Sequence, residues 1–168
     1  LKCYPNLKSI NEHIDHIFIV VDSNKIIKVI KDAISKKVRC ATILSGGFTE
    51  SGSEGNDLEK QVFKIAKKGD LRILGPNSIG LINISDNVIL SANAMLELQD
   101  LKKGSLGVIS HSGSLIGALL AHGHSRGIGF SKLVSVGNES DLSVGEIGKM
   151  LVNDPNTESI ILFLETLR

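Results

Sequence analysis

The sequence predicts an α/β fold with parallel sheets, and three observations support this. Short apolar runs of strand length alternate with helical patterns of about a dozen residues along most of the 168-residue chain. The apolar runs are continuous, which is typical of parallel strands that are covered by helices on both faces. The loops that follow several of these runs are rich in Gly, Ser and Asn. We therefore expect right-handed βαβ units whose polar chemistry gathers at the carboxyl ends of the strands.

The first half of the chain is expected to contain three strands and two helices. The strands are the runs HIFIVVD (16–22), RCATILSGG (39–47) and LRILGPN (71–77). Between them, residues 24–37 and 55–69 carry apolar residues at helical spacing, and Gly69 is placed as the stop of the second helix.

The stretch from residue 82 to residue 104 interrupts this alternation, although VILSA (88–92) within it fits a short strand. The alternation then resumes, with strands expected at 105–110, 130–137 and 158–165 and helices at 113–125 and 143–154. Ser143 is an expected N-cap, and Glu146 is placed to complete a capping box. We therefore predict a first domain over residues 1–85, a linker over 86–103 and a second domain over 104–168.

The composition argues against several classes of function. The formal net charge is only +1 and aromatic residues make up 4% of the chain, with no Trp, so neither nucleic acid nor a membrane surface is an expected partner. No apolar run approaches the roughly 20 residues of a membrane span, and no signal peptide is visible. The two cysteines, Cys3 and Cys40, lack metal-site spacing, and we expect a reduced, cytoplasmic protein without a metal site. Because the chain starts at Leu1, we expect a fragment of a longer protein.

The segment VISHSGSLIGALL (108–120) is the most informative stretch of the sequence. An apolar run ends in small polar residues, and a helical pattern follows at once. The free N–H groups of a first helical turn, together with the helix dipole, favour an anion next to Ser112 and Gly113. The same pattern also fits an ordinary Ser N-cap with a Gly for close packing. The local pattern leaves both interpretations open.

Three further strand ends are polar, and each has a simpler alternative. LSGGFTESG (44–52) could let the backbone approach a ligand closely, or it could be a loop that needs Gly at positive φ. GPNSIG (75–80) could place polar groups past a strand end, or it could be a plain turn. Glu165 ends the apolar run IILFLE, where a carboxylate could orient a base or an imidazole; alternatively, the strand simply ends there.

The histidines give no independent evidence of catalysis. His111 stands beside two serines, but neighbours in sequence do not form a catalytic dyad, and the sequence places no group that would orient the ring. We therefore expect His111 to be a polar loop residue. His122 and His124 lack the i, i+4 spacing of a helical metal pair, and they are expected at the surface with His13 and His16.

Taken together, these loops resemble a known family. ILGPNSIGLIN, GVISHSGSLIGALL, GIGFSKLVSVGNESDL and NDPNTESIILFLE are similar to segments of NDP-forming acyl-CoA synthetases, of the ADP-forming acetate–CoA ligase type and, more distantly, of the succinyl-CoA synthetase alpha subunit. The resemblance implies the C-terminal part of a CoA-binding Rossmann-like domain followed by the first part of a flavodoxin-like domain. It also implies an acid–thiol ligase that makes acyl-CoA from a carboxylic acid, CoA and ATP through phosphohistidine and acyl-phosphate intermediates.

The resemblance also assigns roles to residues near the phosphoryl group. Ser112 and Gly113 match the helix N-terminus that holds the phosphate of the phosphohistidine. Glu165 matches the carboxylate that hydrogen-bonds this histidine and orients it. The reactive histidine itself is expected beyond Arg168, and its role does not transfer to His111, where the family typically has Gln or Arg.

The remaining assignments concern CoA. Asn77 and Ser78 match the segment that lines the reaction site near the CoA thiol, although the family often has Cys where Ser78 stands. Leu44, Ser45 and Gly46 match a strand-end segment that contacts CoA. The Gly-rich loop that binds the CoA nucleotide is expected before Leu1. The resemblance thus implies coenzyme A, ATP/ADP and Mg²⁺ as ligands, with ATP/ADP and Mg²⁺ on an ATP-grasp domain or subunit outside this chain.

Two further functions remain as alternatives at this stage. The same domains occur in some protein acetyltransferases as a CoA- or acyl-CoA-sensing regulatory module without ligase activity. A plain nucleotide- or flavin-binding α/β protein is less well supported, because no G-x-G-x-x-G follows a strand. For the ligase, we expect a small carboxylic acid as substrate and an oligomeric assembly, and we expect this chain alone to be inactive.

Overall fold

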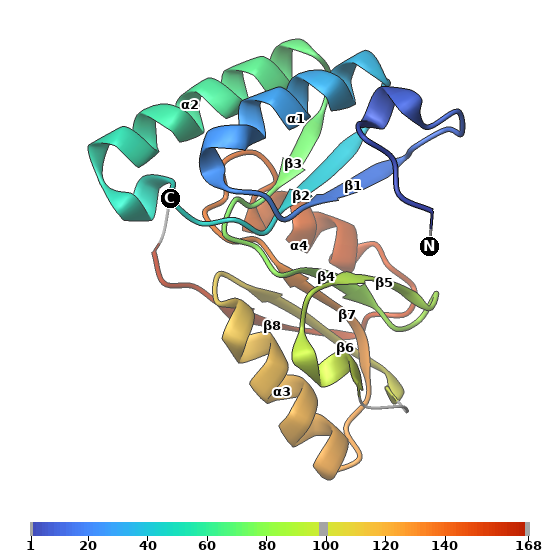
Figure 1. The fold of residues 1–168 in the computed structure, drawn as a ribbon. Helices are drawn as coiled ribbons and strands as arrows, with labels where there is room; N and C mark the ends of the chain where they lie inside the picture. The colour runs from blue at the N-terminus through green and yellow to red at the C-terminus, as the bar shows by residue number, and fades with distance from the viewer. Residues whose placement is uncertain (1, 98–100, 167–168) are drawn as a thin grey trace.

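The computed structural model describes residues 2–97 and 101–166, and its first layer is a parallel sheet with helices on one face (Figure 1). Sheet A has the order β1-β2-β3, from β1 (His16–Ile19), β2 (Cys40–Ile43) and β3 (Arg72–Leu74). Helices α1 (Ser23–Ser35) and α2 (Ser53–Lys68) connect these strands and lie side by side on its outer face. The predicted alternation of strand and helix is confirmed here, with strands shorter than expected.

Sheet B is mixed, and its strand order is β5-β4-β7-β6-β8. Strands β6 (Lys103–Ser110), β7 (Phe130–Ser135) and β8 (Ser159–Phe163) run parallel, as predicted. Helix α3 (Gly113–Ser125) covers one face of this sheet, and α4 (Val144–Val152) lies on the other face, between the two sheets (Figure 1). Three 3₁₀ turns complete the fold: η1 (Leu7–Ser9), η2 (Thr49–Ser51) and η3 (Ala94–Glu97).

A hairpin in the region expected as a linker makes sheet B mixed instead of wholly parallel. Strands β4 (Gly80–Asn83) and β5 (Val88–Ser91) pair antiparallel, and β4 also pairs antiparallel with β7. Within the connecting turn, the Asn83 side chain accepts from the Asp86 N–H at 3.1 Å, and Asn87 has a positive φ of 56°. These local interactions stabilise the turn that joins the two strands. Strand β5 therefore lies inside the predicted linker, 86–103, and β4, although it lies inside the predicted first domain, 1–85, belongs to sheet B. The domain boundary stays a prediction.

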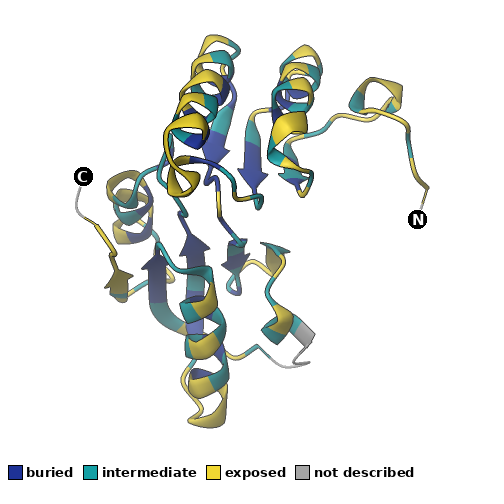
Figure 2. Cartoon of the chain, turned by 60° about the vertical axis from the view of Figure 1, so that its left-hand side comes forward, coloured by how far each residue is buried: buried dark blue, intermediate teal, exposed yellow. Residues whose placement is uncertain are grey.

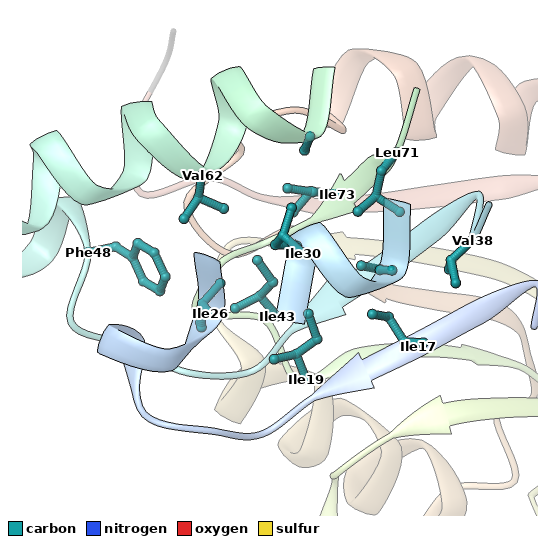
Figure 3. Packing of buried hydrophobic residues seen from close by; sticks show 13 residues of the cluster. Ile17, Ile19, Ile26, Ile30, Val38, Ile43, Phe48, Val62, Leu71 and Ile73 are labelled. Atoms are coloured by element: carbon teal, nitrogen blue, oxygen red, sulfur yellow. The ribbon is translucent and has the colours of Figure 1, made fainter. Parts of the chain in front are cut away.

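The core under sheet A forms where the apolar faces of α1 and α2 meet the strands (Figure 3). Phe48, which follows β2, turns back into this core and is fully buried. Its carbonyl oxygen would lie 1.9 Å from a Cβ at position 55, so the helix can pass this close only with Gly there. Each large apolar side chain buried in this way contributes about 1.5–3 kcal/mol relative to the exposed state.

The helix ends follow local sequence signals. The Ser143 hydroxyl accepts from the Glu146 N–H at 3.2 Å, which confirms the predicted N-cap of α4. The capping box is only half formed, because the Glu146 carboxylate binds Arg72. Gly69 is the C-cap of α2, as expected, and its N–H donates to Ile65 and Ala66 carbonyls.

Burial is uneven across sheet B (Figure 2). The inner ends of β6 and β7 are buried, whereas β8 at the edge of the sheet exposes most of its side chains, including Leu162, which is 52% exposed. No helix within residues 2–97 and 101–166 is both long enough and apolar enough to cross a membrane.

Candidate active site at the junction of the two sheets

The loop after β7 connects the two sheets, and we call residues 137–142 the docking loop. Its N–H groups donate to three backbone carbonyls in β3 and just after it. Asn138 donates to Pro76 at 2.9 Å, Ser140 to Gly75 at 3.3 Å and Leu142 to Ile73 at 3.1 Å. A Cβ at position 137 would lie 2.1 Å from the Pro76 oxygen, which explains the glycine at that point. The carboxyl ends of β3 and β7 are therefore held together by backbone hydrogen bonds.

Glu59 of α2 reinforces this junction from the other side. Its carboxylate accepts from the Thr49 N–H at 3.1 Å and hydroxyl at 2.6 Å, from the Asn138 amide at 3.1 Å and from the Ser140 hydroxyl at 2.6 Å. Burial on its own would raise the pKa of Glu59, but the hydrogen bonds from Ser140, Thr49 and Asn138 outweigh it and hold this pKa below its usual value. The charged form of Glu59 is therefore part of the folded junction.

Arg72 of β3 binds the far end of the docking loop. Its guanidinium donates to Asp141 at 2.9 Å and to Glu146 at 3.0 Å. These hydrogen bonds, first to Asp141 and then to Glu146, raise the pKa of Arg72 above its usual value. The same Asp141 carboxylate accepts from the Ile73 N–H at 2.7 Å, so one side chain fixes both the arginine and the strand backbone.

The segment after β3 lies beside the segment after β2, as the sequence analysis expected for neighbouring strand ends. The Asn77 N–H donates to the Ser45 carbonyl at 3.1 Å, and the Ser78 N–H donates to Ile43 at 3.1 Å. Asn77 is exposed with a φ of 57°, whereas Ser78 is fully buried and its hydroxyl donates to the Ser135 carbonyl at 2.6 Å. Asn77 is thus available to a ligand, and Ser78 is committed to a structural hydrogen bond.

Leu44, Ser45 and Gly46 line an open cavity of about 380 Å³ together with residues 20–23. The cavity lies where β1 and β2 end and α1 begins. The Ser45 hydroxyl donates to the Val21 carbonyl, so the two strand ends are tied to each other. The wall combines apolar residues, such as Val20 and Leu44, with the polar residues Asp22 and Ser23.

Ser112 and Gly113 begin α3, as predicted. The Ser112 hydroxyl accepts from the Leu115 N–H at 3.4 Å, which makes Ser112 the N-cap. A Cβ at position 113 would lie 2.6 Å from the Ile79 side chain, so the glycine lets the segment after β3 pack against the start of α3. Nearby, the buried Ser135 hydroxyl has no hydrogen-bond partner within the described part of the chain. Ser135 pairs across the strands with Ser110, two residues before the N-cap.

His111 has a more specific environment than the sequence indicated. Its side chain is only 7% exposed; Nε2 lies 2.8 Å from a Glu139 oxygen, and Nδ1 accepts from the Glu165 N–H, with 3.0 Å between the nitrogens. His111 does lie in a loop, as expected, but the expectation that no group orients its ring is wrong. The missing signal was long-range: the two partners lie 28 and 54 residues away in sequence.

A cavity of about 190 Å³ lies directly next to His111. Its wall combines four separate segments: η2, the β6–α3 loop, the docking loop and the segment after β8. The lining residues are Thr49, Glu50, His111, Gly137, Asn138, Glu139, Glu165 and Thr166. We call this space the junction cavity. It places three carboxylates and an imidazole around one small volume that both sheets help to form.

Glu50 of η2, which follows strand β2 of sheet A, lines the junction cavity. Its carboxylate accepts from the Gly47 and Phe48 N–H groups at 2.7 and 3.1 Å and from the Asn138 amide at 2.7 Å. Burial would raise the pKa of Glu50, but the Asn138 hydrogen bond and the backbone N–H groups lower it overall. The sequence assigned no role to Glu50 or Asn138, because each becomes significant only through the other, 88 residues away.

The structure thus brings together some predicted site residues and separates others. Glu165 lines the junction cavity with His111, and Ser112 follows His111 directly. Leu44–Gly46 face a different cavity and are linked to the site through Asn77. Among the other histidines, His122 and His124 are exposed as expected, but His16 is half-buried and lies 2.9 Å from the Thr42 hydroxyl.

Comparison with known families agrees with this arrangement of two joined units. Residues 1–84 match a family model described as a CoA binding domain, and residues 103–168 match a model described as a succinyl-CoA ligase like flavodoxin domain. The chain belongs to the CoA-binding domain family. We refer to the two matched parts as the CoA-binding domain and the flavodoxin-like domain. Their order in one chain confirms the resemblance to NDP-forming acyl-CoA synthetases.

Individual relatives support the same assignment. The chain is 33% identical to acetate–CoA ligase [ADP-forming] II of Archaeoglobus fulgidus, covering all of this chain and 25% of the relative. It is 33% identical to the alpha subunit of acetate–CoA ligase [ADP-forming] II of Pyrococcus furiosus, covering all of this chain and 36% of the subunit. A solved dinucleotide-forming acetyl-coenzyme A synthetase 1 of Ca. Korarchaeum cryptofilum, in complex with phosphate and ADP, matches all of this chain and 35% of that chain, with 32% identity and a TM-score of 0.91. The chain therefore spans a quarter to about a third of these relatives.

Proposed function

We propose that this chain forms the CoA-binding and phosphate-transfer part of an ADP-forming acyl-CoA synthetase. The observation that carries the proposal is the junction cavity, where Glu165, the loop that leads into α3 and the docking loop meet at the carboxyl edge of both sheets. Ligands in α/β proteins bind at such edges. The relatives named acetate–CoA ligases support the reaction class, in which a carboxylic acid, CoA and ATP give acyl-CoA, ADP and phosphate.

The cavity beside Leu44, Ser45 and Gly46 is the proposed contact for CoA. This proposal is supported by an open volume of about 380 Å³ at the ends of β1 and β2, where Gly46 has no side chain and an extended ligand could approach the backbone closely. Asn77 connects this cavity to the site, because its N–H bonds the Ser45 carbonyl while its side chain is exposed. In this arrangement Asn77 would lie along the path from the bound CoA to the reacting thiol.

The start of α3 is the proposed phosphate-binding element. The first-turn N–H groups and the helix dipole stabilise negative charge there without further rearrangement. Gly113 contributes no side chain there, because Ile79 occupies the space that a Cβ would fill. Together these groups would hold the phosphoryl group while it passes between a histidine and the carboxylic acid.

Glu165 is the proposed partner of the phosphorylated histidine, which lies outside this chain. Its carboxylate would accept a hydrogen bond from the imidazole and keep the ring in one orientation. ATP and Mg²⁺ are proposed to bind a separate ATP-grasp domain or subunit. Within residues 2–97 and 101–166, no group of three or more His, Cys, Asp or Glu side chains is arranged to hold a metal ion. We also propose that the acid substrate is a small carboxylic acid and that the protein forms an oligomer.

The test uses the full-length protein that contains this chain, with its ATP-grasp partner. The protein is incubated with γ-labelled ATP, and acid-labile, base-stable phosphate on the protein is measured. CoA together with a carboxylic acid, or ADP alone, should discharge the label. Ser112→Asp should abolish labelling, because it adds a negative charge against the phosphate. Ser125→Asp, at the far end of the same helix, is the matched control and should label normally.

Glu165→Gln should label or turn over about 10- to 100-fold more slowly, since the histidine loses the charged acceptor that orients it. Wild-type rates in both the Ser112→Asp and Glu165→Gln variants would contradict the assignments of these residues. A wild-type protein that takes no label but binds CoA or acyl-CoA would favour the sensing module, with the same loops serving as a binding scaffold.

A further inference from the structure

His111 makes one hydrogen bond with each ring nitrogen, and the two bonds have opposite directions. Nδ1 accepts from the Glu165 backbone N–H, so it carries no proton. In the neutral ring the proton then sits on Nε2 and is donated to Glu139 at 2.8 Å. The geometry therefore specifies a neutral imidazole in a single tautomer, although three carboxylates surround the same cavity.

We propose that His111 is a positioning residue for Glu165 and that it acts only while its imidazole is neutral. This inference rests on the function proposed above and adds a regulatory element to the same site. Glu165 is exposed and follows the edge strand β8, whose own side chains are largely exposed. Its backbone hydrogen bond to His111 is consequently a specific attachment to the wall of the junction cavity.

Glu139 connects this attachment to the rest of the junction. One of its oxygens accepts from His111 and the other accepts from the Val144 N–H at 2.6 Å, at the start of α4. Glu139 is 10% exposed on its side chain and belongs to the docking loop, which bonds the CoA-binding domain through its backbone. The position of Glu165 is thus linked, through two side chains, to the loop that joins both domains.

Protonation of His111 would break one bond and keep the other. A protonated ring donates from both nitrogens, so Nδ1 could no longer accept from Glu165, while Nε2 would keep its partner Glu139. The titratable group that contacts the ring is Glu139 of the docking loop, and Glu165 after β8 and Glu50 of η2 line the same cavity. We therefore expect acidification to release the Glu165 segment while the docking loop stays in place.

The first experiment measures amide hydrogen exchange at Glu165 in the full-length protein, corrected for intrinsic rates. The Val136 N–H, which donates to Ser110 in the neighbouring strand pair, is the internal control. His111→Leu removes both hydrogen bonds at similar volume and should raise exchange at Glu165 about tenfold or more at pH 7.5. His111→Gln keeps one neutral acceptor and one donor, so exchange should stay within about threefold of the wild type.

The pH profile separates positioning from a merely structural role. Between pH 7.5 and 5.5, protection at Glu165 should fall in the wild type but persist in the His111→Gln variant, which cannot be protonated. Equal protection in the wild type and the His111→Leu variant would overturn the proposal. So would identical pH profiles in the wild type and the His111→Gln variant, and this comparison remains available if the His111→Leu variant does not fold.

Turnover supplies a second, independent readout. If the wild type transfers phosphate, kcat of the His111→Leu variant should be about tenfold lower than that of the wild type, with unchanged KM for CoA. In the wild type kcat should fall between pH 7.5 and 5.5, and in the His111→Gln variant this fall should be absent. A wild type without phosphate transfer would refute the proposed function, and the exchange data would still decide the role of His111. Normal phosphate transfer with no exchange difference between the variants would refute only the role of His111.

Discussion

Replacement of Glu59 by Gln tests how strongly the two domains are held together. Glu59 is 8% exposed and accepts four hydrogen bonds from Thr49, Asn138 and Ser140. Glutamine has nearly the same shape but no charge, and hydrogen bonds to a charged acceptor are roughly twice as strong as neutral ones. We expect the junction to lose about 2 kcal/mol, which corresponds to roughly 30-fold more frequent local opening.

The assay is amide hydrogen exchange in the docking loop, where the Asn138 and Ser140 N–H groups bond the end of β3. Glu54→Gln, in the exposed first turn of the same helix, is the control and should change exchange there by less than about threefold. The pKa of folded Glu59 lies below its unfolded value, so this stabilisation is present above about pH 4.3 and is lost as pH falls through the folded pKa. Equal docking-loop exchange in the wild type and the Glu59→Gln variant at pH 7 would refute the reasoning.

Two further predictions concern stability. Gly113→Ala should lower the free energy of unfolding by about 1–3 kcal/mol, because its Cβ would meet the Ile79 side chain at 2.6 Å. Gly145→Ala should raise the free energy of unfolding by about 0.5–1 kcal/mol, because its Cβ would meet only a hydroxyl at 3.7 Å. Urea unfolding measures both, and equal effects would contradict the packing argument. Burial lowers the pKa of His16 in the folded state, so its contribution is complete above about pH 6.5 and declines as pH falls below it. The urea midpoint should drop less between pH 7.5 and 5.5 in the His16→Gln variant than in the wild type; identical drops would contradict this.

The parts of the fold that local sequence determines were predictable. Helix α3 begins and ends at the predicted residues, and Ser143 caps α4 as expected, because N-caps and apolar periodicity act over three or four residues. The β4–β5 hairpin was expected only in part. VILSA fitted a strand, but the pairing of β4 with β7 depends on residues about 50 positions apart, which no local pattern reports.

The sequence predicted which loops form the candidate site, but it did not predict the side-chain contacts within it. Ser112 and Glu165 were identified from their places at strand and helix ends. Glu59 has the sequence signature of a solvated helix charge, and only the docking loop, 79 to 81 residues later, buries it. His111 likewise gains its tautomer and orientation from groups that lie 28 and 54 residues away in the sequence.

The pairing of β4 with β7 also affects how the protein is made. About 50 residues must be added after β4 before its partner strand exists, which takes roughly 3 to 10 s at the usual rates of synthesis. During that time β4 has no β7 to pair with, and apolar side chains such as Ile82, which is 1% exposed in the folded protein, stay accessible on the hairpin. A nascent chain paused in this interval should recruit hydrophobic-binding chaperones, and it should release them once β7 has left the ribosome.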